Sequence, residues 1–318
     1  MRTAVGAAEA PRPGGRAAAL YIGVDGGGTR SRALLGDREG RGLAVADGGP
    51  GLIDPGAPRG AAFAVRTVAL EAARRARVRL PARALWAGLA GAGNESARVV
   101  VEKELRDAGL ARRVVVGTDV EAAHADAFGN GPGVLLVAGT GSVVRAVDPR
   151  GEVVTVGGWG ALLGDEGGGY GIGLDGIRAV LRAADGREPE TDLTDALLSE
   201  TGTAGARELA DWAVGASKGE IAALSVTVAK VSKTGDVVAA RVVHRALGAV
   251  REHLEAVPGR TGGWGGRPAV AFVGGLIRAG GVLREVVAEV AEEVGYEVRV
   301  DEVVPERGAL RRAVGLGG

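Results

Sequence analysis

The stretches "GVDGGGTRSRALL" (residues 23–35) and "VAGTGSVVRAVD" (residues 137–148) share one pattern. Each starts with an apolar run typical of a buried strand, passes through a glycine turn with a hydroxyl residue, and returns as a strand that carries an arginine. A strand, a glycine-rich turn and a second strand predict a β-hairpin. Because the unit occurs twice, we expect a fold built from two copies of one domain.

The segments that follow the two hairpins support this duplication. A third short strand and then alternating helices and strands follow the first hairpin, and the second hairpin starts the same order again. We therefore predict an α/β fold of two lobes, residues 17–118 and 119–318, with a disordered tail over residues 1–16. The last helix, about residues 308–318, is expected to pack back on the N-terminal lobe. The predicted strands are 17–24, 30–37, 43–46, 84–89, 113–116, 133–137, 143–148, 151–157, 269–273 and 296–300. The predicted helices are 60–78, 97–108, 120–128, 172–184, 192–198, 203–214, 219–232, 237–257, 282–294 and 308–314.

The composition of the 318-residue chain excludes several classes of function. With 39 basic and 39 acidic residues, the chain has no net charge that would attract nucleic acid or an anionic membrane. The absence of cysteine excludes disulfides, thiolate nucleophiles and cysteine-held zinc or iron–sulfur centres. No apolar run approaches the roughly 20 residues of a membrane span. We therefore expect a cytoplasmic protein.

The turn of the first hairpin is a candidate phosphate site. Its three glycines let consecutive backbone N–H groups point at one place, and such a nest binds anions. The acidic side chain in it would repel a phosphate unless a cation lay between them, and Mg²⁺ with a water shell fits that role. Taken alone, the turn is equally consistent with an ordinary glycine-rich hairpin. The residues are Asp25, Gly26, Gly27, Gly28 and Thr29.

The turn of the second hairpin strengthens the phosphate interpretation. Gly139, Thr140, Gly141 and Ser142 form a second nest with two hydroxyl groups. Two nests on duplicated units are able to face each other across a cleft and hold a polyphosphate between them. Neither turn has the lysine of a P-loop or the G-x-G-x-x-G spacing of a dinucleotide-binding turn, so both of those folds are disfavoured.

Two further motifs have a structural and a functional interpretation. Asp119 lies between a strand and a helix, where its carboxylate is the expected N-cap and is also able to accept the proton of an attacking hydroxyl. The local sequence favours the N-cap, the position between the two nests favours the base, and the roles are compatible. Gly274 and Gly275 end a strand, which suits a tight turn or a flat adenosine group lying on bare backbone.

Together these motifs resemble the actin/hexokinase/Hsp70 superfamily of ATPases. The stretch "AGTGSVVRAVDPRGEVVTVGGWGALLGDEGGGYGIG" (residues 138–173) is more specifically similar to the N-acetylglucosamine kinase and BadF/BadG/BcrA/BcrD ATPase family. The resemblance runs from about Tyr21 to the C-terminus. It implies a two-lobed, actin-like (ribonuclease H-like) fold with a central cleft. Activators in that family carry cysteine-held iron–sulfur clusters, which a chain without cysteine cannot hold, so the sugar-kinase branch remains.

The resemblance also implies an activity and a set of site residues. The expected enzyme is an ATP- and Mg²⁺-dependent kinase that phosphorylates the 6-hydroxyl of glucosamine or N-acetylglucosamine, with a homodimer as the assembly. Asp119 matches the catalytic base, Asp25 the residue that holds Mg²⁺ through water, and the two nests with Gly274 and Gly275 the ATP-binding segments. The positions that match sugar-binding residues are Asp119, Thr140, Gly158, Trp159, Gly160 and Asp165. Trp159 offers a flat face that packs on the sugar or braces its loop, and we favour bracing.

One departure leaves the substrate open. The family usually places an asparagine in the loop after the third strand, whereas this chain has "GPGLIDP" there, with Asp54 as the candidate substitute. An aspartate accepts hydrogen bonds but cannot donate the N–H of an asparagine. Cationic glucosamine therefore competes with N-acetylglucosamine as the expected substrate. Two other functions stay open, a non-catalytic sugar or nucleotide sensor and an ATPase that acts on a non-sugar partner.

Overall fold

The computed structural model describes residues 19–317, so the tail predicted for residues 1–16 lies outside the described residues. Two mixed five-stranded sheets have the same topology, β3-β2-β1-β4-β5 and β8-β7-β6-β9-β10. In each, the first two pairings are antiparallel and the other two are parallel. This equivalence confirms the duplicated, two-lobed α/β fold. The strands are β1 (Tyr21–Gly26), β2 (Ser31–Gly36), β3 (Gly42–Gly48), β4 (Ala82–Leu89), β5 (Ala111–Gly117), β6 (Gly133–Ala138), β7 (Ser142–Val147), β8 (Val153–Gly157), β9 (Ala269–Val273) and β10 (Glu297–Val298).

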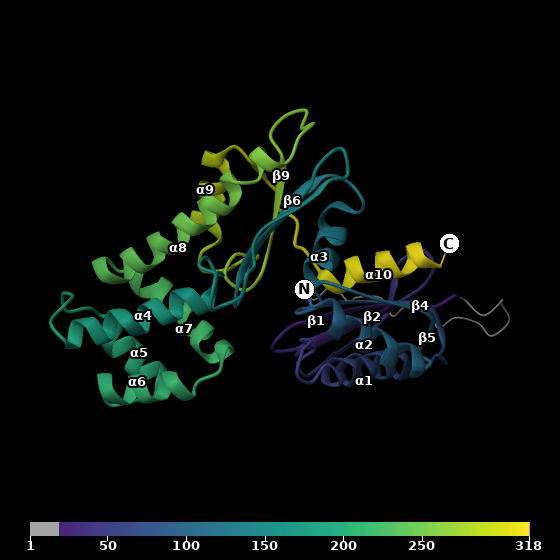
Figure 1. Ribbon diagram of the computed structural model, residues 1–318, viewed down its shortest axis with the longest axis horizontal. Helices are drawn as coiled ribbons and strands as arrows, with labels where there is room; N and C mark the ends of the chain where they lie inside the picture. The colour runs from purple at the N-terminus through teal and green to yellow at the C-terminus, as the bar shows by residue number, and fades with distance from the viewer. Residues whose placement is uncertain (1–18, 318) are drawn as a thin grey trace, which may run out of the picture.

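The first lobe is the sheet β1–β5 with helices on both faces. Helices α1 (Arg59–Ala76) and α2 (Glu95–Asp107) cover one face, and α10 (Pro305–Leu316) covers the other (Figure 1). A Cβ on Gly23 of β1 would lie 2.1 Å from the backbone nitrogen of Leu310. Because residue 23 is a glycine, α10 lies directly on the backbone of β1, and the end of the chain is thereby held on the first lobe.

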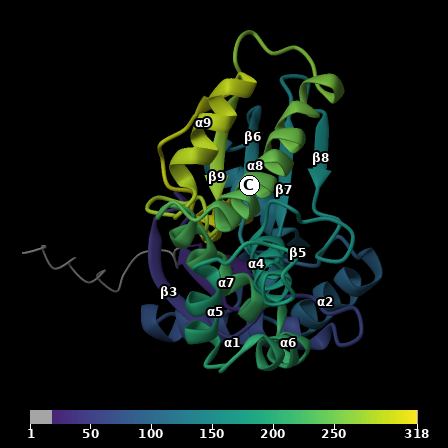
Figure 2. The ribbon, with the colours of Figure 1, turned by 90° about the vertical axis from the view of Figure 1, so that its left-hand side faces the viewer.

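The second lobe is the sheet β6–β10 with a larger set of helices. Figure 2 shows α8 and α9 over this sheet, and the other helices extend the lobe away from it. The helices are α4 (Gly169–Ala184), α5 (Leu193–Thr201), α6 (Ala206–Gly215), α7 (Lys218–Ser232), α8 (Val237–Glu255) and α9 (Arg284–Val294), with a 3₁₀ turn at Pro258–Arg260. Asp236 caps α8, since its carboxylate accepts hydrogen bonds from the backbone N–H groups of Val238 and Ala239.

Helix α3 (Asp119–Phe128) lies between the two lobes. On one side Ala122 packs with Trp86 and Ala309, which belong to the first sheet and to α10. On the other side Ala123 packs with Leu135 of the second sheet. Small alanine side chains let both sheets approach the helix closely, so α3 is the element that sets where its first residue, Asp119, lies. Among the described residues, no helix is both long and apolar enough for a bilayer span.

Candidate active site

The turn of the first hairpin keeps its tip free for a ligand. Gly27 donates its N–H to the carbonyl of Arg30 at 2.9 Å, which closes the turn. The backbone N–H groups of Gly28 and Thr29 donate to no carbonyl within residues 19–317, and both residues are exposed. Gly26 is the buried end of β1. The predicted nest therefore presents unpaired N–H groups, as anion binding requires.

The turn of the second hairpin is held from behind by α4. The carbonyls of Gly139 and Thr140 accept the first N–H groups of that helix, from Gly169 at 2.8 Å and from Tyr170 at 2.9 Å. The N–H groups of Thr140 and Gly141 are unused by carbonyls of the described chain. Since the carbonyls point into the protein, the free N–H groups are the side of the turn that a ligand meets.

The glycine pair after β9 lies against this second turn. Gly274 has a φ of +110°, and a Cβ on it would lie 2.3 Å from the carbonyl oxygen of Ala138. Leu276 donates its N–H to the same carbonyl at 3.2 Å. Around Gly275 a Cβ would meet no atom within 4 Å. The structure thus places the two predicted nucleotide segments side by side and leaves open space above Gly275.

Asp119 is the first residue of α3 and not its N-cap, which corrects the local interpretation of the sequence. Thr118 caps the helix, with its hydroxyl accepting from the Glu121 N–H at 3.1 Å and the Glu121 carboxylate accepting from the Thr118 N–H at 2.9 Å. This reciprocal capping box frees the Asp119 carboxylate from the capping role. Burial raises the pKa of Asp119, and hydrogen bonds from the backbone N–H groups of Val120 and Asp119 oppose that rise. A raised pKa suits a proton acceptor that works near neutral pH.

Asp25 lies beside Asp119 at the carboxyl ends of parallel strands. In the register of the sheet Asp25 pairs with Gly88, and Gly88 pairs with Gly117, two residues before Asp119. A Cβ on Gly88 would lie 3.1 Å from the carbonyl of Thr118 and would push α3 away. Because residue 88 has no side chain, the two carboxylates come together. Sequence reasoning missed Gly88, since its role depends on a helix that approaches from elsewhere.

A third carboxylate, Glu306 in the first turn of α10, completes this cluster and was also missed. It is buried and lies 3.4 Å from the guanidinium of Arg32. The pKa of Asp25 is raised to about 7, first by burial and then by the charges of Asp119 and Glu306, against a lowering by Arg30 and Arg32. Three neighbouring carboxylates around Asp25 are an environment that a divalent cation would stabilise.

The loop from Gly157 to Gly169 is hydrogen-bonded to the second hairpin. Gly158, with a φ of +72°, donates its N–H to the Ser142 carbonyl at 3.0 Å, and Gly167 donates to the Ser142 hydroxyl at 3.1 Å. Burial raises the pKa of Asp165, and hydrogen bonds from the N–H groups of Ser142 and Gly160 lower it. The predicted sugar-binding and phosphate-binding residues are therefore parts of one connected structure.

The middle of this loop is exposed. The side chains of Trp159, Leu162 and Leu163 are 78%, 92% and 77% exposed. An indole ring with so much free surface does not brace the loop, so the bracing role favoured from the sequence is not seen. The ring is instead available for a ligand.

Asp54 lies in an exposed loop of the first lobe, next to the first hairpin turn. The loop before it is anchored on both sides, because Gly51 donates its N–H to the Gly27 carbonyl at 2.9 Å and Ile53 donates to the Ala90 carbonyl at 2.9 Å. The exposed carboxylate of Asp54 accepts the Gly56 N–H at 2.9 Å through one oxygen. The other oxygen has no partner among the hydrogen bonds of residues 19–317 and is able to accept from a substrate.

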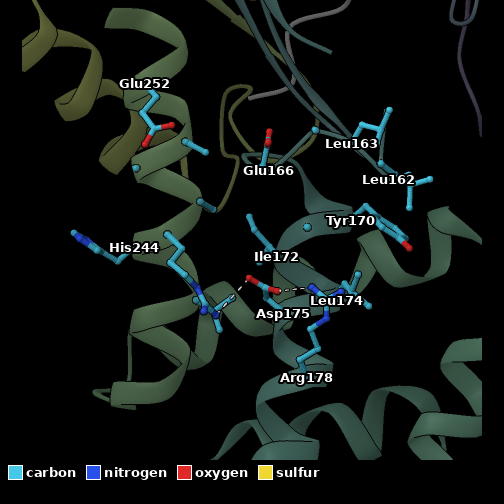
Figure 3. Close-up of a pocket in the computed structure, with 18 of the residues that line it drawn as sticks. Leu162, Leu163, Glu166, Tyr170, Ile172, Leu174, Asp175, Arg178, His244 and Glu252 are labelled. Atoms are coloured by element: carbon cyan, nitrogen blue, oxygen red, sulfur yellow. Dashed lines mark hydrogen bonds and ion pairs between the residues drawn. The ribbon is translucent and has the colours of Figure 1, made fainter. Parts of the chain in front are cut away.

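A groove of about 1120 Å³ lies beside the loop, between α4 and α8 (Figure 3). Leu162, Leu163 and Glu166 form one wall, and neither Asp25 nor Asp119 lines it. The groove is thus separate from the carboxylate cluster. Lys218, at the start of α7, also lines the groove. The charge of Lys218 opposes the rise in the pKa of Asp165 that burial causes.

The chain is similar to a family of ATPases and to proteins named as amino-sugar kinases. The family described as "BadF/BadG/BcrA/BcrD ATPase family" matches residues 22–310. An N-acetylmuramic acid/N-acetylglucosamine kinase of Clostridium acetobutylicum is 28% identical over 228 residues, which cover 71% of this chain and 74% of the relative. A glucosamine kinase of Vibrio cholerae is 31% identical over 182 residues, which cover 56% of this chain and 60% of the relative. A crystal structure of a candidate N-acetylglucosamine kinase from Chromobacterium violaceum superposes with a TM-score of 0.79 at 27% identity, over 92% of this chain and 98% of that one.

Proposed function

The chain belongs to the BadF/BadG/BcrA/BcrD ATPase family, and we propose that it acts there as an ATP-dependent kinase that phosphorylates the 6-hydroxyl of a hexosamine. The relatives named as amino-sugar kinases support the substrate class. The observation that carries the proposal is the position of Asp119. It is a carboxylate with a raised pKa, free of the capping role, beside Asp25 at the ends of β1 and β5.

The two hairpin turns would bind the phosphates of ATP. Free N–H groups at Gly28 and Thr29 in the first lobe, and at Thr140 and Gly141 in the second, supply donors from both sides. The open backbone at Gly275 would accept the adenosine end. Closure of the lobes would exclude water, which otherwise competes with the sugar as acceptor.

Mg²⁺ fits the charge of this site. Residues 19–317 contain no group of three or more side chains arranged to hold a metal ion by themselves. Asp25 would therefore hold the ion through water together with the phosphates of the nucleotide. When bound, the ion supplies positive charge that neutralises the phosphates. The raised pKa of Asp25 is consistent with this role, because it reflects burial of the carboxyl group and, second, the nearby charges of Asp119 and Glu306.

The transfer step would use Asp119 as the base. The sugar would lie between Asp54 on the first lobe and the loop of Gly158, Gly160 and Asp165 on the second. Asp119 would accept the proton of the sugar's 6-hydroxyl. The hydroxyl oxygen would form a bond to the γ-phosphorus while the bond from that phosphorus to ADP breaks. The products are a hexosamine 6-phosphate and ADP.

A kinase assay would decide whether the hexosamine is glucosamine or N-acetylglucosamine. ADP release would be measured with glucosamine, N-acetylglucosamine, glucose and N-acetylmuramic acid, and phosphorus NMR of the product would locate the phosphate. Strong stimulation by a hexosamine is expected. ADP release without sugar would favour an ATPase with a non-sugar partner, and nucleotide binding without turnover would favour a sensor. The homodimer stays a prediction, which analytical ultracentrifugation tests.

Asp119→Asn tests the base directly. The variant keeps the shape of the side chain but accepts no proton, so we expect kcat to fall by roughly 10²- to 10⁴-fold. Calorimetric affinity for ATP should stay near that of the unchanged protein. Asp195→Asn, at an exposed aspartate in α5, is the matched control and should leave kcat unchanged. Near-normal turnover in Asp119→Asn would remove Asp119 from the mechanism.

A further inference from the structure

Two segments of the described chain connect the lobes, and they are bonded to each other. One is α3 with residues 129–132, which leads from β5 to β6, and the other is residues 299–304, which lead from β10 to α10. Figure 1 shows α3 and α10 side by side where the lobes meet, and the two helices are in close contact. A movement of one lobe against the other must pass through these two connections.

Asp126, near the end of α3, ties the two connections together. Its side chain is 1% exposed. The carboxylate accepts the Val304 N–H at 2.7 Å and two N–H groups of Arg307, from Nε at 2.5 Å and from Nη2 at 2.6 Å. A bidentate arginine–carboxylate pair fixes direction as well as distance. One buried side chain on the first connection therefore holds the start of α10 on the second.

Backbone packing reinforces this tie. A Cβ on Gly308 would lie 1.9 Å from the carbonyl oxygen of Ala122, so α10 and α3 touch backbone to backbone. Arg311 of α10 donates to the Asp126 carbonyl at 2.9 Å, and Arg299 donates to the Ala127 carbonyl at 2.8 Å. The two helices are thus built to move as a single body.

The tied helices carry the carboxylate cluster. Asp119 begins α3, about 10 Å along the helix from Asp126 at 1.5 Å per residue. Two consecutive residues in the first turn of α10 serve these two contacts. Glu306 lies beside Asp25, and Arg307 bonds Asp126. Beyond the tie, the chain continues through residues 129–132, "GNGP", where Gly129 has a φ of +64°. The glycines make this segment, rather than α3, the place where the backbone is able to bend.

We propose that Asp126 is a positioning residue for the kinase reaction. By fastening α3 to α10 it keeps Asp119 aligned with Asp25 on the first lobe, while the second lobe closes by bending at residues 129–132 and 300–303. Asp126 touches neither nucleotide nor sugar and acts only through α3. The proposal rests on the proposed kinase activity, and its test includes a measurement that does not need that activity.

The test compares Asp126→Asn with a matched control. Asp126→Asn removes the charge and places an amide against Arg307, which should let α3 shift. We expect kcat to fall at least 10-fold, with the KM values for ATP and hexosamine within about 2-fold, because ground-state binding is unaffected. The control is Asp148→Asn, another buried aspartate, which accepts N–H groups of Arg150, Glu152 and Gly262 in the second lobe away from α3. It should lower stability and leave kcat unchanged.

Amide hydrogen exchange gives the second measurement. Exchange in residues 119–125 and 304–309 should speed up at least 10-fold in Asp126→Asn and stay unchanged in Asp148→Asn. Arg307→Lys keeps the charge but loses the bidentate geometry, so it should give an intermediate kcat and replaces Asp126→Asn if that variant does not fold. Equal kcat and equal exchange in Asp126→Asn and Asp148→Asn would overturn the proposal. Absence of hexosamine-dependent ADP release in the unchanged protein would instead overturn the kinase function, while the exchange data would still report on Asp126.

Discussion

A Cβ atom on Gly141 would lie 2.5 Å from Oδ2 of Asp165, so the turn of the second hairpin and the loop from Gly157 to Gly169 occupy adjoining space with no room for a side chain between them. The same turn is packed from the other side, because a Cβ on Gly168 would lie 2.5 Å from the carbonyl carbon of Gly141. The Ser142 N–H also hydrogen-bonds the Asp165 carboxylate. A change in one segment must therefore move the other, and we expect the proposed phosphate and sugar sites to be mechanically linked.

Gly141→Ala tests this link. The added methyl group would displace the Asp165 carboxylate, so we expect the KM for the hexosamine to rise about 10-fold, equivalent to about 1.4 kcal/mol of lost binding. The KM for ATP should change less. Gly60→Ala, where a Cβ would meet no atom within 4 Å, is the control and should leave both constants unchanged. An unchanged sugar KM in Gly141→Ala would show that Asp165 does not contact the sugar.

Trp159→Ala separates ligand contact from loop support. Because the indole is 78% exposed, its removal should change Tm by no more than about a degree. Loss of a flat apolar face against the sugar ring should raise the sugar KM about 10-fold, in line with the large contact area of an aromatic side chain. Leu162→Ala, at a side chain that is 92% exposed in the same loop, should leave the sugar KM nearly unchanged. A lower Tm with normal KM would instead restore the bracing role.

The repeated hairpins made the fold predictable, because each combines a buried strand, a glycine turn and a return strand within a few residues. The N-cap of α8 at Asp236 was predictable for the same reason, since capping is decided by neighbours in the chain. The interpretation of Asp119 as an N-cap was wrong although the signal was present. The sequence "TDVE" at residues 118–121 contains the threonine and the glutamate of a capping box, and these favour Thr118 as the cap.

The residues that were missed depend on distant parts of the chain. Glu306 reaches Asp25 only because α10 returns to the first lobe and packs on the bare backbone of Gly23. Gly88 matters only because α3 passes over it. Asp126 looks like one more polar residue of a short helix until Arg307 arrives from the other end of the chain. No local pattern contains these partners, so tertiary packing alone reveals them.

Asp25→Asn tests the electrostatics of the cluster through stability. The pKa of Asp25 is raised from 3.8 to about 7 in the folded protein, so between these values the folded state holds a proton that the unfolded state has lost. Stability contributed by this proton is present below about pH 4 and is lost as the pH rises through about 7. At pH 8, without nucleotide or Mg²⁺, we expect the neutral variant to be more stable by an amount on the order of 4 kcal/mol at most, because a pKa unit corresponds to about 1.4 kcal/mol.

The measurement is chemical denaturation of both proteins from pH 4 to pH 8. The difference in unfolding free energy should grow with pH and nearly vanish at pH 4. Asp195→Asn, at an exposed aspartate, should show no such trend. If Asp25→Asn were less stable than the unchanged protein at pH 8, Asp25 would have a favourable partner in the folded state, and the carboxylate cluster would not carry the excess negative charge that we assign to it.

Asp54→Asn addresses the choice of hexosamine. Asp54 has one carboxylate oxygen free of the Gly56 N–H, and as a pure acceptor it favours a protonated amine or a hydroxyl over an acetamido carbonyl. The side-chain amide of asparagine would donate an N–H hydrogen bond to the carbonyl oxygen of the N-acetyl group. We therefore expect the ratio of kcat/KM for N-acetylglucosamine to that for glucosamine to rise about 10-fold, since one hydrogen bond to a neutral group contributes about 1 kcal/mol and loss of the charge weakens binding of the cationic sugar. Asp47→Asn, at an exposed residue of β3 that pairs with Arg32, should leave the ratio unchanged. A ratio that did not move in Asp54→Asn would show that the amino group of the sugar lies elsewhere in the cleft.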